Sequence, residues 1–235
     1  MPVRRSASAV WTALLAAALL VAGACTAAKQ PQAPAARLVA ADFFPAEPGM
    51  NWTYDGWGNE FAAYRRTATH RRGQRAQIVH VSGAVVAWVY DIEPDRVTLR
   101  AMSGELQEET ADYLDAPDEL GRVILQEPLA VGAQWRTPTW VRRSDDGPGD
   151  LDDRYVWETR RIEGVGETLE TPAGTFRNVI RVRVIPDEGV ESLEYYAPGV
   201  GLIRSEYLYD EPIISALSAF WLGSIPGQPA GPPSP

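Results

Sequence analysis

The chain has only two histidines, on which most metal or hydrolytic chemistry would depend. His70 and His80 flank a probable turn at residues 72–74, so two paired strands could bring them together. No cysteine and no carboxylate at ligand spacing completes a zinc set, and neither histidine has an identifiable nucleophile as a partner. We therefore expect exposed strand histidines, and no catalytic residue, cofactor or metal.

A second candidate is the acidic loop "SDDGPGDLDD" at residues 144–153. Calcium prefers flexible loops rich in oxygen ligands, and Asp145, Asp146, Asp150 and Asp152 would supply them. The spacing does not fit an EF-hand, which needs glycine at loop position six and glutamate at position twelve. The sequence favours a solvated hairpin loop, with calcium binding as the alternative.

Aromatic residues are the third candidate. Exposed rings could stack on a sugar or line a groove for an apolar ligand, whereas buried rings would fill the core of a sheet. Tyr195 and Tyr196 are adjacent in a segment predicted to be extended, so they should point to opposite faces. The possible ligand-facing residues are Trp52, Trp57, Trp135, Trp140, Tyr195 and Tyr196.

The N-terminus has the pattern of an export signal. Residues 1–24 contain two arginines near the start and an apolar run too short for a comfortable membrane span. Residues 22–25, "AGAC", resemble the lipobox of bacterial lipoproteins, which implies that Cys25 receives a diacylglycerol and becomes the new N-terminus. The alternative is an ordinary secretory signal beside an incidental cysteine. Two acyl chains would anchor the protein to a bacterial membrane, outside the cytoplasm.

Composition divides the remainder of the chain. Residues 25–37 form a lipidated cysteine and a flexible tether, residues 38–222 a single domain, and residues 223–235 a disordered Pro/Gly tail. Because Cys25 is the only cysteine, the domain has no internal disulfide. The net charge of −9 argues against nucleic acid as a partner.

Alternation with period two dominates the domain. In "TFRNVIRVRV" (175–184), apolar residues and arginines fall on opposite faces, as in a half-buried strand. Short turns separate such runs, and residues 168–185 form the clearest hairpin. We predict an all-β fold, with at most one short helix at 108–121 or 212–223, built as a single antiparallel meander: a twisted open sheet, a half-barrel or a barrel. Residues 202–209 are predicted to lie beside the 175–185 strand.

Two segments resemble a diffuse group of uncharacterised bacterial secreted proteins and lipoproteins. "DFFPAEPGMNWTYDG" (42–56) is similar to the group's opening motif, and "TPAGTFRNVIRVRV" (171–184) with "EYYAPGVGLIRSE" (194–206) is similar to its closing hairpin and strand. The resemblance implies an extracytoplasmic β-sheet domain with no established catalytic residues.

Three functions stay open. The first is a lipid-anchored envelope protein with a non-catalytic binding or structural domain, whose ligand would be a lipid, a glycan or another envelope protein. The second is an envelope hydrolase that uses paired carboxylates with opposed pKa shifts. The third is an accessory subunit that docks through its apolar C-terminal segment, residues 213–222.

The anchor gives a direct prediction. Cys25→Ser should release the protein from membranes into the soluble fraction, because the acidic domain has no electrostatic affinity for anionic lipid. Fractionation of cells followed by immunoblotting measures this, and unchanged membrane retention would contradict the assignment of Cys25.

Overall fold

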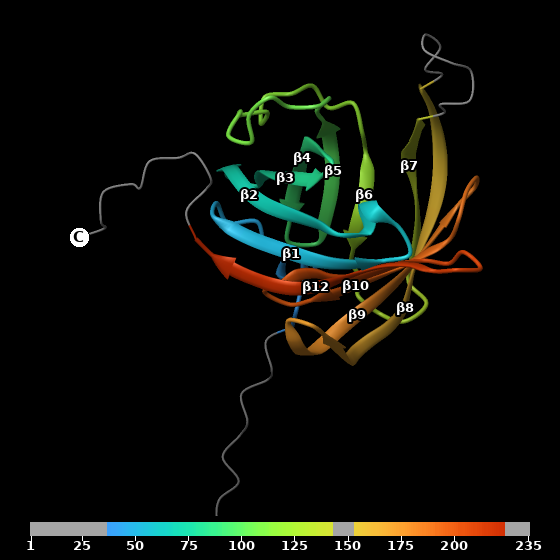
Figure 1. Cartoon of the computed structure of the whole chain (residues 1–235). Coiled ribbons are helices and arrows are strands. Elements are labelled where there is room, and N and C mark those ends of the chain that lie inside the picture. Colours follow the sequence, from blue (N-terminus) through green and yellow to red (C-terminus); the bar gives the residue numbers. More distant parts are fainter. Residues whose placement is uncertain (1–36, 143–152, 224–235) are drawn as a thin grey trace, which may run out of the picture. The chain divides into compact units, whose positions relative to one another are not determined.

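The computed structural model describes residues 37–142 and 153–223, whose regular structure is β apart from two short 3-10 turns (Figure 1). No helix within these ranges is long and apolar enough to cross a bilayer. The turns are η1 (Ala40–Phe43) and η2 (Glu60–Ala62). The strands are β1 (Met50–Trp57), β2 (Tyr64–Arg72), β3 (Arg75–Ser82), β4 (Ala84–Glu93), β5 (Arg96–Met102), β6 (Arg122–Gln126), β7 (Gln134–Arg142), β8 (Asp153–Thr171), β9 (Gly174–Pro186), β10 (Ser192–Ala197), β11 (Gly201–Tyr207) and β12 (Ile213–Leu222).

All twelve strands belong to one antiparallel sheet in the order β6-β5-β4-β3-β2-β1-β12-β11-β10-β9-β8-β7. Strands that are neighbours in sequence pair with one another, except β6 and β7, and β1 also pairs with β12, from Met50 opposite Leu222 to Trp57 opposite Ile214. The predicted all-β meander is confirmed. The segment 212–223 is a strand rather than a helix, and both of its edges are paired.

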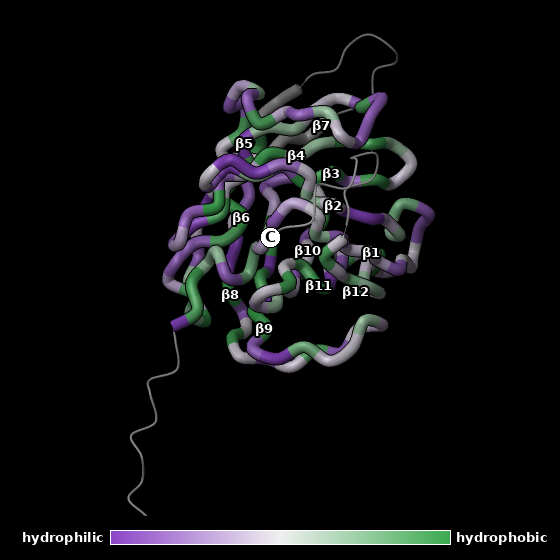
Figure 2. Tube along the Cα trace, turned by 90° about the vertical axis from the view of Figure 1, so that its left-hand side faces the viewer, coloured by the Kyte–Doolittle hydropathy of each residue, from purple (hydrophilic) through white to green (hydrophobic). Residues whose placement is uncertain are grey.

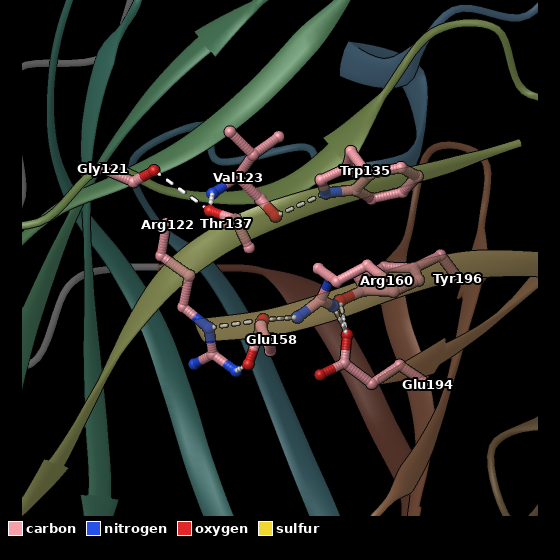
Figure 3. Close-up of polar contacts among 9 residues, drawn as sticks. All are labelled: Gly121, Arg122, Val123, Trp135, Thr137, Glu158, Arg160, Glu194 and Tyr196. Atoms are coloured by element: carbon pink, nitrogen blue, oxygen red, sulfur yellow. Dashed lines mark hydrogen bonds and ion pairs between the residues drawn. The ribbon is translucent and has the colours of Figure 1, made fainter. Parts of the chain in front are cut away.

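The sheet curls into a nearly closed barrel, and side chains join its two edges, β6 and β7 (Figure 3). The Thr137 hydroxyl accepts a hydrogen bond from the Val123 backbone N–H at 2.7 Å and donates to the Gly121 carbonyl at 3.2 Å. The Trp135 indole N–H donates to the Val123 carbonyl at 2.9 Å. These bonds satisfy edge groups that would otherwise be unpaired.

Hydrophobic and hydrophilic residues are interspersed along the strands (Figure 2), as expected for a sheet with one face turned to a core. The predicted hairpin at 168–185 is β8–β9, with Thr171 opposite Gly174. One pairing prediction is wrong: β11 lies between β10 and β12, so β10 separates residues 202–207 from β9. The segment with Tyr195 and Tyr196 was predicted to be extended, but it was not counted as a separate strand between β9 and residues 202–207.

The outer face of β3–β5 is covered by residues 103–121, which contain no helix. Leu106 packs on Val79 and Ala87, and Leu114 packs in a separate small cluster on the same face. The Gln77 side chain fixes this loop, because its amide donates to the Ala111 carbonyl at 2.8 Å and its oxygen accepts from a backbone N–H of the loop at 2.7 Å.

Residues 40–46 close one end of the barrel. Phe43 and Phe44 are buried there, and the Phe44 ring lies 4.7 Å from the Tyr90 ring. The segment is bound to the turns at that end: Asp42 accepts a hydrogen bond from the Gly199 N–H at 2.7 Å, and Ala41 donates to Pro94 at 3.4 Å. The turn between β3 and β4, together with η2, lies at the other end.

The junction between β6 and β7 can be tested with Thr137→Val, which keeps the shape of the side chain but removes both hydrogen bonds. The free energy of unfolding should fall by about 1–2 kcal/mol, because a buried backbone N–H loses its acceptor. Urea denaturation measures this, and amide exchange at Val123 should accelerate. Thr175→Val, at an exposed position on β9, is the matched control, and an equal effect at both positions would contradict the role of Thr137.

Candidate functional site

The barrel contains a cavity of about 550 Å³ that opens at the end opposite residues 40–46 and reaches inward as far as Phe44. Most of its lining is aromatic or aliphatic, with a few polar groups, which is the composition of a small-molecule site. The lining residues from β2–β6 and η2 are Asn59, Phe61, Ala62, Tyr64, Arg66, His80, Ser82, Ala84, Val86, Trp88, Tyr90, Leu99, Arg122 and Ile124, and the others are Phe44, Glu194, Tyr196, Leu202, Ser205, Tyr207, Tyr209, Ile213 and Ser215.

The mouth of the cavity carries exposed aromatic side chains. Phe61, Tyr207 and Tyr209 all line the cavity, and their exposed fractions are 60%, 47% and 50%. Phe61 follows Asn59, whose side chain caps η2 by accepting from the Phe61 N–H at 2.9 Å. Exposed apolar residues that cluster at a cavity entrance are typical of a binding site rather than of ordinary surface.

A row of aromatic rings runs across β1–β4 on the inner face. Tyr54 stacks on Tyr64 at 4.3 Å, Tyr64 lies 4.5 Å from His80, and His80 stacks on Trp88 at 5.2 Å. Cross-strand register explains the row, because Tyr54 is directly opposite Tyr64 and the other pairs are diagonal neighbours. The aromatic row gives the cavity one rigid wall.

Arg66 lies in the same wall, two residues after Tyr64 on β2, and is therefore further from the mouth of the cavity. It is only 8% exposed, and its guanidinium lies over the Trp88 ring at 4.9 Å. Its Nη2 donates to the Tyr90 hydroxyl at 3.2 Å, whereas its buried Nε has no acceptor. Within the described residues, no carboxylate is within ion-pair distance of Arg66.

A second group of charges lies in the opposite wall, on β6, β8 and β10 (Figure 3). Glu158 accepts two hydrogen bonds from Arg122, at 3.0 and 2.8 Å, and one from Arg160 at 2.9 Å. Arg160, which is fully buried, also binds Glu194, and Glu194 accepts from the Tyr196 hydroxyl. Each guanidinium of this group is therefore paired with a carboxylate, as buried charges must be, and only the Nε of Arg160 has no acceptor among them.

Burial sets the protonation of the uncharged polar groups in the cavity wall, and of Tyr54, which stacks on this wall without lining the cavity. It raises the pKa of Tyr54 to about 12 and also raises the pKa values of Tyr64, Tyr90 and Tyr196, so these phenols stay neutral. Burial, aided by the nearby charge of Arg66, lowers the pKa of His80 to about 3. At neutral pH, the aromatic wall therefore has a single charge, that of Arg66.

The charges around Glu158 hold this carboxylate in its ionised form, which does not suit the role of a general acid. Burial alone would raise the pKa of Glu158, but Arg160 and Arg122 hold it below its usual value, so the group is ionised at neutral pH. Glu194, the other carboxylate at the cavity, is bound to Arg160. Within residues 37–142 and 153–223, no group of three His, Cys, Asp or Glu residues is placed to hold a metal ion.

The residues predicted to face a ligand are dispersed. Among those whose side chains the structure describes, only Tyr196 lines the cavity of about 550 Å³. The Trp52 indole is buried and donates to the Val200 carbonyl at 2.7 Å, and Trp135 lies at the β6–β7 junction. Tyr195 is buried away from the cavity lining. Trp57 is 49% exposed outside the cavity, whereas Cys25, the side chain of Trp140, and Asp145, Asp146, Asp150 and Asp152 lie outside the described part of the chain.

The expectation of two exposed histidines is wrong: both are half-buried, and His80 lies in the aromatic wall. The sequence analysis also missed Tyr64, Arg66 and Trp88 as cavity residues. A usable signal was present. Tyr64, Arg66 and Ala68 are spaced two residues apart on β2 and therefore share one face, so Arg66 lies on the face with residues that belong inside. The neighbouring Arg65 obscured this pattern, since arginine then appeared on both faces.

Comparisons with known proteins give only distant likenesses. No family model and no curated protein matches the sequence. Three solved structures resemble it. A protein from Bacteroides fragilis described as exported, with a YmcC-like fold, has 17% identity and a TM-score of 0.38, and the match covers 76% of this chain and 98% of that chain. A protein from Parabacteroides distasonis described as a lipoprotein has 14% identity and a TM-score of 0.39, with 76% of this chain and 98% of that chain covered, and the hypothetical lipoprotein YmcC from Escherichia coli has 14% identity and a TM-score of 0.38, with 81% and 91% covered. At these values no residue role can be transferred, so the function must be argued from the residues of this chain.

The lowered pKa of His80 predicts a pH dependence of stability. Below pH 6.5, the unfolded chain binds a proton at His80 that the folded chain does not bind until about pH 3, so stability is lost as the pH falls. Between pH 7 and pH 5, the native protein should lose about 1–2 kcal/mol of unfolding free energy relative to His80→Phe. Urea denaturation of both proteins at the two pH values measures this difference, and parallel losses would contradict it.

Proposed function

We propose that this protein is a lipid-anchored cell-envelope protein whose β domain is a binding module that holds a small, largely apolar ligand inside the barrel. The cavity of about 550 Å³ carries the proposal. Volumes of roughly 300–1,000 Å³ are typical of sites that bury most of a small ligand. A barrel made only for structural purposes would fill this space with side chains.

The wall and the mouth of the cavity support the same function. Trp88, Val86 and Ile124 offer apolar contact within the cavity, and Phe61 and Tyr209 extend the apolar surface out to solvent. A ligand that enters there would move from water into contact with aromatic surface along its whole path. The resulting gain is the hydrophobic effect, which scales with the apolar area removed from water.

The sequence supports the location. The export signal, the lipobox-like residues before Cys25 and the tether of residues 25–37 attach the domain to a membrane outside the cytoplasm. A tether of this kind would hold the binding domain near the bilayer while leaving its mouth free to receive a ligand. A lipid or another amphiphile would be the most abundant apolar ligand at that place.

A neutral fluorescent probe, N-phenyl-1-naphthylamine, tests the function. The probe should bind the exported chain carrying Cys25→Ser, which needs no detergent, with increased fluorescence and a stoichiometry of one. Val86→Trp should reduce the affinity about tenfold or more, because an indole would occupy the cavity that Val86 lines.

Val131→Trp is the matched control, since Val131 is 66% exposed and lies outside the cavity. The urea midpoints of both variants show whether they are folded. Absence of probe binding to the native chain, or equal binding by a folded Val86→Trp variant, would refute a ligand site in the barrel.

A further inference from the structure

We infer that the ligand is an amphiphile with a single negative charge, a carboxylate on an apolar chain, and that Arg66 binds its head group. This inference rests on the proposed function, because it specifies the chemistry of the ligand that the cavity would hold. The observation that carries it is a buried guanidinium on the cavity wall without an anionic partner.

The environment of Arg66 leaves an anion site open. A buried charge is costly unless it is paired and hydrogen-bonded. The other two arginines at the cavity, the half-buried Arg122 and the buried Arg160, are both paired with glutamates. The Nε–H of Arg66 has no acceptor, which is also true of Arg160. What distinguishes Arg66 is that its guanidinium has the Tyr90 hydroxyl and the Trp88 ring as partners but no carboxylate. A carboxylate can accept two parallel hydrogen bonds from one guanidinium, which would satisfy this group.

The balance of charge indicates a monoanion. Arg66, Arg122 and Glu194 line the cavity. Glu158 forms an ion pair with Arg122, and Arg160 forms an ion pair with Glu194. This set contains three cations and two anions, although the whole chain has a net charge of −9. The excess positive charge in the cavity is therefore one, which a carboxylate would neutralise and a doubly charged phosphate ester would exceed.

The position of Arg66 sets the orientation of the ligand. Tyr64 lies between Arg66 and the mouth on the same face of β2, and the exposed rings of Phe61, Tyr207 and Tyr209 lie at the entrance. A head group on Arg66 would place the apolar chain along the aromatic wall and out toward these rings. The charged group would thus lie deep in the cavity, and the apolar tail would lie toward the mouth.

The test compares decanoate with 1-decanol, which has the same chain and no charge, as competitors of N-phenyl-1-naphthylamine on the exported chain carrying Cys25→Ser. Decanoate should compete at least about tenfold better than decanol at neutral pH, because a charge-assisted bidentate contact is worth at least that factor. Decyl phosphate should bind no more tightly than decanoate.

Two arginines on β2 provide the matched variants. Arg66→Met should abolish the preference for decanoate, which is read as a ratio between two competitors and so does not depend on how tightly the variant binds the probe. Arg66→Lys should retain part of the preference. Arg65→Met should leave it unchanged, since Arg65 is on the opposite face and binds Glu109. Arg66→Gln replaces the Met variant if that variant does not fold, and the decanoate-to-decanol ratio of the native chain is decisive in either case.

The outcomes separate the two proposals. Probe binding without a preference for decanoate, or a preference that persists in a folded Arg66→Met or Arg66→Gln variant, would overturn the anion site and leave the binding function intact. Tighter binding of decyl phosphate than of decanoate would overturn the assignment of a single charge. Failure of the native chain to bind any of these probes would refute the proposed function itself, and the anion site with it.

Discussion

The barrel depends on the contact between the beginning and the end of the domain. Two side chains of β1 reach over β12 to carbonyls at β11: the Trp52 indole donates to Val200 and the Tyr54 hydroxyl donates to Leu202, both at 2.7 Å. Gly201 lies between these carbonyls with a φ of +96°, and a Cβ there would be 3.6 Å from Pro45. The segments 42–56 and 194–206 are therefore two halves of one packed unit, and a substitution in either would disturb both.

The same unit explains why the barrel is closed at one end and open at the other. Residues 40–46 are held against the turns near Pro94 and Gly199, so aromatic packing fills that end. The opposite end has only η2 and short turns. A cavity there survives because polar and charged groups interrupt the core: Arg66 and the Arg122–Glu158–Arg160 group need hydrogen bonds that close apolar packing would deny them.

Period-two alternation and turn residues were sufficient to predict the all-β meander and the β8–β9 hairpin, because both depend on neighbours in sequence. The site depends instead on which face of each strand turns inward. In β9, apolar residues and arginines separate cleanly, whereas in β2 the pair Arg65 and Arg66 puts one arginine on each face. A charged residue inside a barrel violates the pattern on which such predictions rest, and functional sites are where violations are expected.

The order of the strands also has a kinetic consequence. The edges of the sheet, β6 and β7, lie in the middle of the sequence, whereas the central pair joins β1 to β12 across nearly the whole domain. As the chain is delivered from its N-terminus, β1–β6 can pair locally, but the free edge of β1 has no partner until β12 has been made. An unpaired edge can pair with the edge of another chain and start aggregation. The rate at which β12 is delivered therefore sets how long the edge of β1 is exposed to such pairing.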